Sequence, residues 1–177
     1  MVFGDSLSAG FGLHKDEGWV ELLQQKLNKQ QFNYTVINAS ISGDTTSSGL
    51  TRLPNALNTN LPDIVILELG GNDGLRGLSL KSMKSNLSTM VDLCLNIDAK
   101  VLLVGMQLPP NYGPFYVNTF SKSYSDLANE KNIPLLPFLL AGFESDMSYF
   151  QRDKIHPNAK AQGLIVQNVW GKLKPLL

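Results

Sequence analysis

Residues Ile64–Gly74 read IVILELGGNDG, an apolar run that ends abruptly in glycines and polar side chains. Within Ile64–Leu69 the residues are nearly all apolar rather than alternating, which is typical of a parallel strand that is covered on both faces. Ligands of open α/β sheets bind outside the carboxyl ends of the strands. The stretch therefore predicts a buried parallel strand whose end, Gly70–Gly74, borders a functional site.

Similar apolar runs lie on both sides of this stretch and alternate with helical patterns. The runs are Met1–Phe3, Tyr34–Asn38, Val101–Met106 and Ile133–Leu136, and apolar residues at helical spacing fall in Trp19–Leu27, Leu80–Cys94, Phe120–Ala128 and Ala161–Val169. Such alternation predicts βαβ units with a parallel sheet, and we expect one α/β domain over residues 1–177. Thr45–Leu57 also has helical spacing, but Pro54 should kink or end a helix there.

The N-terminal residues give two further expectations. Met1–Phe3 is about half of a mean strand, which is roughly 5–6 residues long, so the first strand is truncated in this chain. No charged segment followed by an apolar stretch, as in a signal peptide, stands at the start. If an export signal has been removed upstream, the protein is periplasmic or secreted, and otherwise it is cytoplasmic.

Composition argues against several functional classes. The 177 residues include 15 Lys and Arg and 15 Asp and Glu, so no net charge attracts nucleic acid or anionic membranes. The single cysteine, Cys94, allows neither an intrachain disulfide nor a cysteine-built metal cluster. No apolar run reaches the roughly 18 residues that a membrane span needs. We expect no cofactor, no metal, no nucleic acid and no stable membrane insertion, and a monomer or weak oligomer that acts on a small molecule.

Three polar residues near predicted strand ends suit acyl transfer. Ser6 follows the first run, and a serine hydroxyl becomes a nucleophile only when a base within hydrogen-bond reach takes its proton. Asp153 precedes His156 by one short turn, so its carboxylate can fix the imidazole tautomer and stabilise the imidazolium. Taken alone, such a serine is more often a turn residue, and such a pair a surface aspartate beside a histidine at a helix start. Their occurrence together predicts a nucleophile, Ser6, with a base, His156.

Acyl transfer also needs donors that stabilise the tetrahedral oxyanion. Gly43 can offer a backbone N–H with no side chain in the way, and Asn72 can offer its side-chain amide. Each of the two loops could equally be a plain turn. Both follow predicted strands, however, and would lie on the same edge of the sheet as Ser6.

The chain resembles the SGNH (GDSL) hydrolase family in four blocks that occur in order. The blocks are Gly4-Asp5-Ser6-Leu7, Gly43, Gly71-Asn72-Asp73 and Asp153 with His156-Pro157. Leu67–Gly77, Leu108–Gly113 and Ile133–Phe138 are similar to the bacterial branch of multifunctional thioesterases, lysophospholipases and arylesterases. The resemblance covers nearly the whole chain.

This resemblance implies a fold and an activity. The fold is a flavodoxin-like three-layer α/β/α sandwich with a five-stranded parallel sheet of order 2-1-3-4-5, and the activity is hydrolysis of carboxylic esters. The implied roles are Ser6 as nucleophile, His156 as base, Asp153 as its orienter, and Gly43, Asn72 and the Ser6 N–H as oxyanion donors. The substrates implied are esters or thioesters with short to medium acyl chains, aryl esters and lysophospholipids.

Apolar residues on the same edge of the sheet as Ser6 could hold an acyl chain. The expected substrate-binding residues are Leu75, Leu108, Pro109 and Tyr112. They could equally cover the end of a helix. The competing functional class is a flavodoxin-like small-molecule binding module without catalysis. Against it, the first loop carries an acidic residue, Asp5, where an anion would bind, and no phosphate-binding glycine motif is present.

Overall fold

The computed structural model describes all residues 1–177 and arranges them in three layers. The middle layer is a parallel sheet of four strands, in the order β1 (Val2–Gly4), β2 (Ile64–Glu68), β3 (Lys100–Val104) and β4 (Leu135–Leu136). Every residue of β2 is buried, as the continuously apolar run predicted. The strands at residues 64–69, 101–106 and 133–136 were thus predicted to within about two residues at each end.

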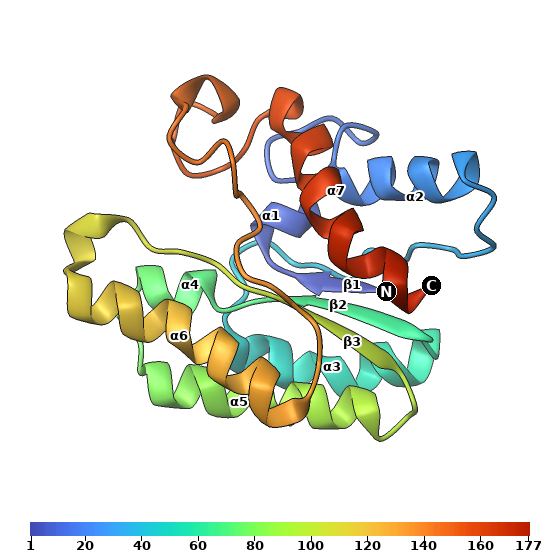
Figure 1. The fold of residues 1–177 in the computed structure, drawn as a ribbon, viewed down its shortest axis with the longest axis horizontal. Coiled ribbons are helices and arrows are strands. Elements are labelled where there is room, and N and C mark those ends of the chain that lie inside the picture. The colour runs from blue at the N-terminus through green and yellow to red at the C-terminus, as the bar shows by residue number, and fades with distance from the viewer.

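Helices cover both faces of the sheet (Figure 1). On one face lie α1 (Ser6–Ala9), α2 (Trp19–Lys29) and α7 (Ala159–Leu173), and on the other lie α3 (Thr46–Asn60), α4 (Gly71–Leu75), α5 (Leu80–Leu95) and α6 (Pro114–Lys131). Short 3-10 turns span Pro110–Tyr112, Met147–Tyr149 and Lys174–Leu176. A single cluster of 40 buried apolar residues fills the space between the layers, which removes both sheet faces from water.

The predicted five-stranded sheet is wrong, and the order 2-1-3-4-5, which requires the missing strand, is not confirmed. Residues 34–38 form only one isolated bridge, Asn38 to Val2. The reason is the short β1: because it begins at Val2, the residues before Ile37 have no strand beside them. The Gln24 side chain takes their hydrogen bonds instead, accepting from Val36 N at 2.6 Å and donating to Tyr34 O at 3.0 Å.

Pro54 was expected to kink or end a helix, and it does not end it, because α3 continues through Pro54 from Thr46 to Asn60. A proline in a helix removes one backbone hydrogen bond and crowds the preceding turn. Pro54 is exposed, so water can satisfy the freed carbonyl, whereas Leu53 and Leu57 face the core and are buried. Burial of that leucine face offsets the local cost of the proline.

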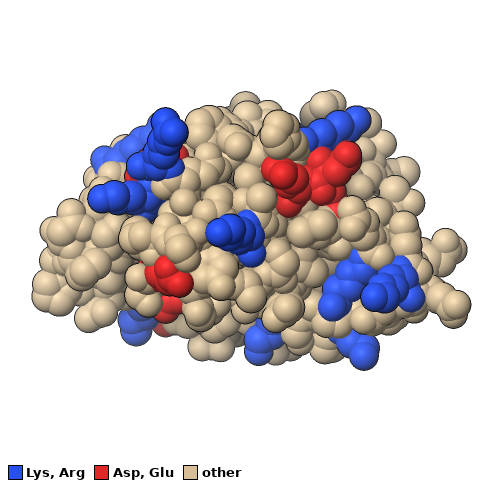
Figure 2. All heavy atoms as spheres, turned by 90° about the horizontal axis from the view of Figure 1, so that it is seen from above, with Lys and Arg blue, Asp and Glu red and all other residues tan.

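Charged side chains of both signs lie in several separate groups on the face that Figure 2 shows. Figure 2 shows Lys and Arg interspersed with Asp and Glu on the face that carries α2 and α7, with no patch of one sign across it. None of the helices combines the length and the apolar character that crossing a bilayer would require.

Candidate active site

Ser6 lies where the first strand turns into a short helix. β1 ends at Gly4, the Asp5 carboxylate caps α1 by accepting from Leu7 N at 3.0 Å, and Ser6 is the first helical residue. The first N–H groups of a helix have no intrahelical partner. The Ser6 N–H therefore remains a donor beside its own hydroxyl.

The structure brings Ser6, His156 and Asp153 together from opposite ends of the chain. His156 Nε2 lies 2.9 Å from Ser6 Oγ, and His156 Nδ1 lies 2.6 Å from Asp153 Oδ2. The other carboxylate oxygen, Asp153 Oδ1, accepts from Ile155 N at 2.9 Å and from His156 N at 3.0 Å. An ionised Asp153 accepts the Nδ1 proton, so Nε2 is left to accept the proton of the serine hydroxyl.

These contacts also determine the charge of Asp153. Partial burial acts to raise its pKa, but the hydrogen bonds from the N–H groups of His156 and Ile155 and from the His156 side chain outweigh burial and lower the pKa to about 2. The carboxylate is therefore ionised at neutral pH.

Two residues that the sequence interpretation did not consider hold the His156 loop in place. The Phe11 ring packs on the imidazole, with ring centroids 4.5 Å apart. Gln151 joins the two loops, donating to Phe11 O at 2.7 Å and Pro157 O at 3.1 Å, while its N–H donates to His156 O at 2.8 Å. Sequence spacing carries no signal for such contacts, because Phe11 and Gln151 are 140 positions apart.

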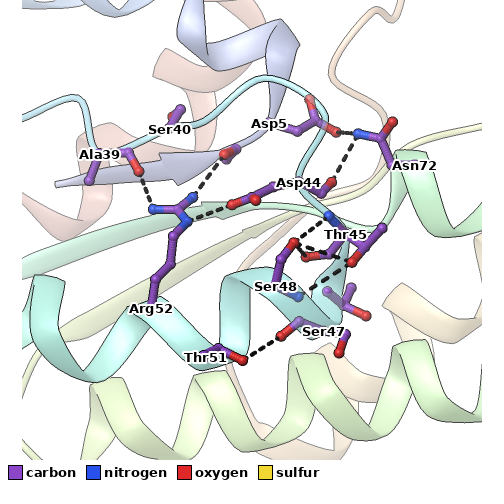
Figure 3. Close-up of polar contacts among 12 residues, drawn as sticks. Asp5, Ala39, Ser40, Asp44, Thr45, Ser47, Ser48, Thr51, Arg52 and Asn72 are labelled. Carbon is purple, nitrogen blue, oxygen red and sulfur yellow. Dashed lines mark hydrogen bonds and ion pairs between the residues drawn. The ribbon is translucent and has the colours of Figure 1, made fainter.

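The two predicted oxyanion donors lie in different environments. Gly43, at φ +85°, is exposed, and its N–H makes no hydrogen bond within the protein. The Asn72 amide is engaged: Nδ2 donates to Asp5 Oδ2 at 3.1 Å and to Asp44 O at 2.9 Å (Figure 3). Asn72 therefore connects the Ser6 loop with the Gly43 loop, and an oxyanion would have to compete for one of its N–H groups.

Asn72→Ala should lower kcat by about 10²–10³ with KM little changed, as expected for a donor that acts mainly on the transition state. The measurement is steady-state hydrolysis of an aryl ester, with a melting curve to show that the variant is folded. An unchanged kcat would mean that Asn72 only links Asp5 to Asp44.

A buried carboxyl, Glu68, lies under the Ser6 loop. Its Oε2 accepts from Ser8 Oγ at 2.7 Å and from Asp5 N at 3.4 Å, and its Oε1 has no partner. Burial, and next the nearby Asp5 charge, raise the pKa of Glu68 well above its ordinary value. Burial also raises the pKa of Asp5 to about 6, but Leu7 N, His156 and Asn72 oppose the rise. We assign the proton to Glu68 and the charge to Asp5, because both Asp5 oxygens accept hydrogen bonds, from Leu7 N and Asn72 Nδ2, and His156 is near, whereas Glu68 Oε1 has no partner.

Glu68→Gln should remove a pH dependence of stability. A raised folded-state pKa means that the folded protein keeps a proton that the unfolded chain has lost, so stability falls as pH rises from about 4.5, the ordinary glutamate value, towards the folded-state value. Gln resembles the protonated acid and does not titrate. The Tm of Glu68→Gln minus the Tm of wild type should therefore increase with pH across that window. Two Tm curves that run parallel with pH would contradict the assignment of the proton to Glu68.

The predicted substrate-binding residues do not all line an open surface. Tyr112 and Pro109 are exposed, and the Tyr112 hydroxyl donates to Leu75 O at 2.9 Å, which holds the loop before α6 against the end of α4. Leu75 is partly buried. Leu108 is only 6% exposed and packs in the core beside Gly74. Leu108 therefore packs under the end of α4 and is not open to a substrate.

The chain is similar to known esterases and thioesterases in sequence and in structure. Residues 2–164 match the GDSL-like lipase/acylhydrolase family. The chain is 48% identical over its full length to the esterase TesA of Pseudomonas aeruginosa and covers 88% of that protein. It is also 41% identical over its full length to the thioesterase 1/protease 1/lysophospholipase L1 of Escherichia coli K12 and covers 84% of that protein. It also superposes on the psychrotrophic esterase EstA of Pseudoalteromonas, a structure inhibited by monoethylphosphonate, with a TM-score of 0.94 and 40% identity over 98% of this chain and 95% of that one.

The chain has a three-layer α/β fold, and its relatives place it in the class of serine ester hydrolases. It belongs to the GDSL-like lipase/acylhydrolase family.

Proposed function

We propose that this protein hydrolyses carboxylic esters and thioesters through an acyl-enzyme formed on Ser6. The observation that carries the proposal is the continuous chain of hydrogen bonds from Asp153 Oδ2 through the His156 ring to Ser6 Oγ, at 2.6 and 2.9 Å. A nucleophile within reach of a base that is itself oriented by a third group is the arrangement that acyl transfer requires.

In the first half-reaction, His156 Nε2 takes the hydroxyl proton as Ser6 Oγ attacks the carbonyl carbon. The carbonyl oxygen becomes an oxyanion, for which the N–H groups of Ser6 and Gly43 are the proposed donors, together with the Asn72 amide. When the intermediate collapses, the bond to the alcohol or thiol breaks, and His156 returns the proton to that leaving group. Ser6 then carries the acyl group as an ester.

In the second half-reaction, water replaces the leaving group. His156 takes a proton from the water as its oxygen attacks the acyl carbon, and then returns that proton to Ser6 Oγ, so the free acid and the original enzyme are released. Throughout, the Asp153 carboxylate stabilises the imidazolium and holds its Nδ1 proton.

The proposed substrates are esters or thioesters with short to medium acyl chains, including aryl esters and lysophospholipids. Support comes from four apolar side chains that are each between about a third and a half exposed: Phe11, Ile41, Tyr112 and Ile155. Phe11 packs on His156, Ile155 directly precedes it, Ile41 lies two residues before Gly43, and Tyr112 bonds to the end of α4, the helix that carries Asn72. The named activities of the relatives, esterase and thioesterase/lysophospholipase, fall in the same chemical class.

The test combines covalent labelling with a substrate panel. An organophosphonate should label the wild-type protein once, at Ser6, because only an activated serine reacts. The panel consists of p-nitrophenyl esters of increasing acyl length, acyl-CoAs and lysophosphatidylcholine. A protein that is neither labelled nor active on any of these substrates would be a flavodoxin-like binding module instead.

A further inference from the structure

The Gly43 loop, residues Ala39–Asp44, contains no helix and no strand, yet it carries a proposed oxyanion donor. Its own backbone supplies two hydrogen bonds near Gly43: Ile41 N donates to Gly4 O at 3.0 Å, and Asp44 N donates to Ile41 O at 3.2 Å. Side chains from other segments also hold the loop: Arg76 Nη2 donates to Gly43 O at 3.1 Å, and Asn72 Nδ2 donates to Asp44 O at 2.9 Å. Neither of these two side chains contacts both ends of the loop.

Arg52, on the second turn of α3, contacts this loop at both ends (Figure 3). Its Nε donates to Asp44 Oδ2 at 2.5 Å, and its Nη1 donates to Ala39 O at 2.5 Å. Its third nitrogen, Nη2, donates to Gly4 O at 3.2 Å. The guanidinium also lies over the buried Phe3 ring, 3.7 Å from its centroid.

The acceptors of Arg52 are positions that matter for the proposed chemistry. Gly4 lies two residues before Ser6, and Asp44 directly follows Gly43. One rigid, planar group therefore joins the strand that leads to the nucleophile with the loop that carries the donor. The Asp44 carbonyl is in turn held by Asn72, so Asp44 is fixed through its side chain and its backbone.

We infer that Arg52 is a positioning residue for ester hydrolysis, which sets the distance between the Gly43 N–H and the carbonyl attacked by Ser6. The inference rests on the proposed function, because it assigns a role within that reaction. Arginine suits the role because its planar fork presents five N–H donors in fixed directions, whereas lysine has a single, mobile ammonium. Arg52 touches neither Ser6 nor His156, so its effect passes through the backbone of the Gly43 loop.

The role predicts a particular kinetic pattern. Misplacement of a donor weakens contact with the oxyanion, which forms only in the transition state, so kcat should fall while KM stays nearly constant. In a well-oriented site, a shift of about 1 Å can cost about 10²-fold in rate. The pH profile should keep its shape, because Arg52 does not contact the His156–Asp153 pair.

The test compares three variants with wild type on a soluble aryl ester. Arg52→Met keeps the apolar cover over Phe3 but loses all three hydrogen bonds, and its kcat should fall by about 30–100-fold. Arg52→Lys keeps the charge next to Asp44 but loses the planar guanidinium, and kcat should fall by about tenfold.

The matched control is Lys131→Met. Lys131 is a cation as exposed as Arg52, at 23% against 22%, and it pairs with Asp92 away from the site. Its kcat should stay within about twofold of wild type, whatever its loss of stability.

Two further measurements separate positioning from general stabilisation. The affinity for an alkyl boronic acid, which forms a tetrahedral adduct with an activated serine, should fall in parallel with kcat across the Arg52 variants. Amide hydrogen exchange in residues 39–44 should be faster in Arg52→Lys and Arg52→Met and unchanged in Lys131→Met. If Arg52→Met does not fold, Arg52→Lys carries the same test.

The inference is overturned if Arg52→Lys retains wild-type kcat, if KM rises while kcat does not change, or if Lys131→Met lowers kcat as much as the Arg52 variants do. A failure of the proposed function gives a different result. In that case the wild-type protein is itself inactive on every ester and is not labelled by the phosphonate.

Discussion

Ser6→Ala should lower kcat by about 10⁴-fold or more, because loss of the nucleophile leaves only transition-state binding and solvent attack. Stability should hardly change, since the Ser6 hydroxyl has one hydrogen-bond partner, His156, and that ring keeps its bond to Asp153. The measurement is kcat for an aryl ester, together with Tm, for purified wild-type and variant protein. Retention of more than about a tenth of the wild-type activity would remove Ser6 from the mechanism.

Ser8→Ala is the matched control, and it should show the opposite pattern. Ser8 is also on α1, but it is buried and its Oγ donates to the buried Glu68 at 2.7 Å. Removing that donor leaves the buried Glu68 Oε2 with only the long hydrogen bond from Asp5 N at 3.4 Å, which costs about 1–3 kcal/mol of stability. Ser8→Ala should therefore lower Tm while retaining phosphonate labelling at Ser6, so any loss of labelling specific to Ser6→Ala is due to the nucleophile.

Asp153→Asn should lower kcat by up to about 10⁴-fold without unfolding the loop. The amide oxygen of asparagine can still accept from the N–H groups of Ile155 and His156, as Asp153 Oδ1 does. The amide nitrogen, however, would face His156 Nδ1 as a second donor. It would favour the wrong imidazole tautomer and leave the imidazolium without its counter-charge.

The same variant should lower kcat/KM at every pH of the assay range. The pKa of Asp153 is lowered to about 2, so in the wild-type protein the carboxylate keeps its negative charge throughout that range. Because Asp153→Asn lacks this charge at every pH, the imidazolium formed during the reaction loses its counter-charge across the whole range. Rates measured from about pH 5 to 10 test this; superimposable profiles would exclude control by the Asp153–His156 pair.

Several features of this protein could be predicted from local sequence patterns. A strand buried on both faces leaves a continuous apolar run, so β2 and β3 were predicted closely, and the helical stripes at 19–27, 80–94, 120–128 and 161–169 all fall within observed helices. Because the carboxyl ends of parallel strands share one edge, the order of elements also predicted which polar residues would meet. The hydrogen bonds between His156 and Ser6 and between His156 and Asp153 agree with that prediction.

Pairing and burial depend instead on contacts between distant segments, which leave no local pattern. Residues 34–38 have the composition of a strand, but a strand requires a partner, and β1 is too short to provide one along their length. Pro54 should interrupt a helix, yet the buried leucine face of α3 outweighs its cost. Glu68 stands in the middle of an apolar run, a signal of a buried acid that the sequence analysis did not use, and its contact with Asp5 arises only in the folded structure.

The link from Arg52 to Gly4, Ala39 and Asp44 is the clearest case. In the sequence Arg52 is one polar residue of an amphipathic helix, and nothing in its neighbours distinguishes it from an exposed arginine. The packing of α3 against the sheet brings its guanidinium beneath the Gly43 loop, where carbonyl and carboxylate oxygens from three separate positions converge on it. Chemical identity and strand order determine which groups can react, whereas the distances at which they are held arise from the packing of helices on the sheet.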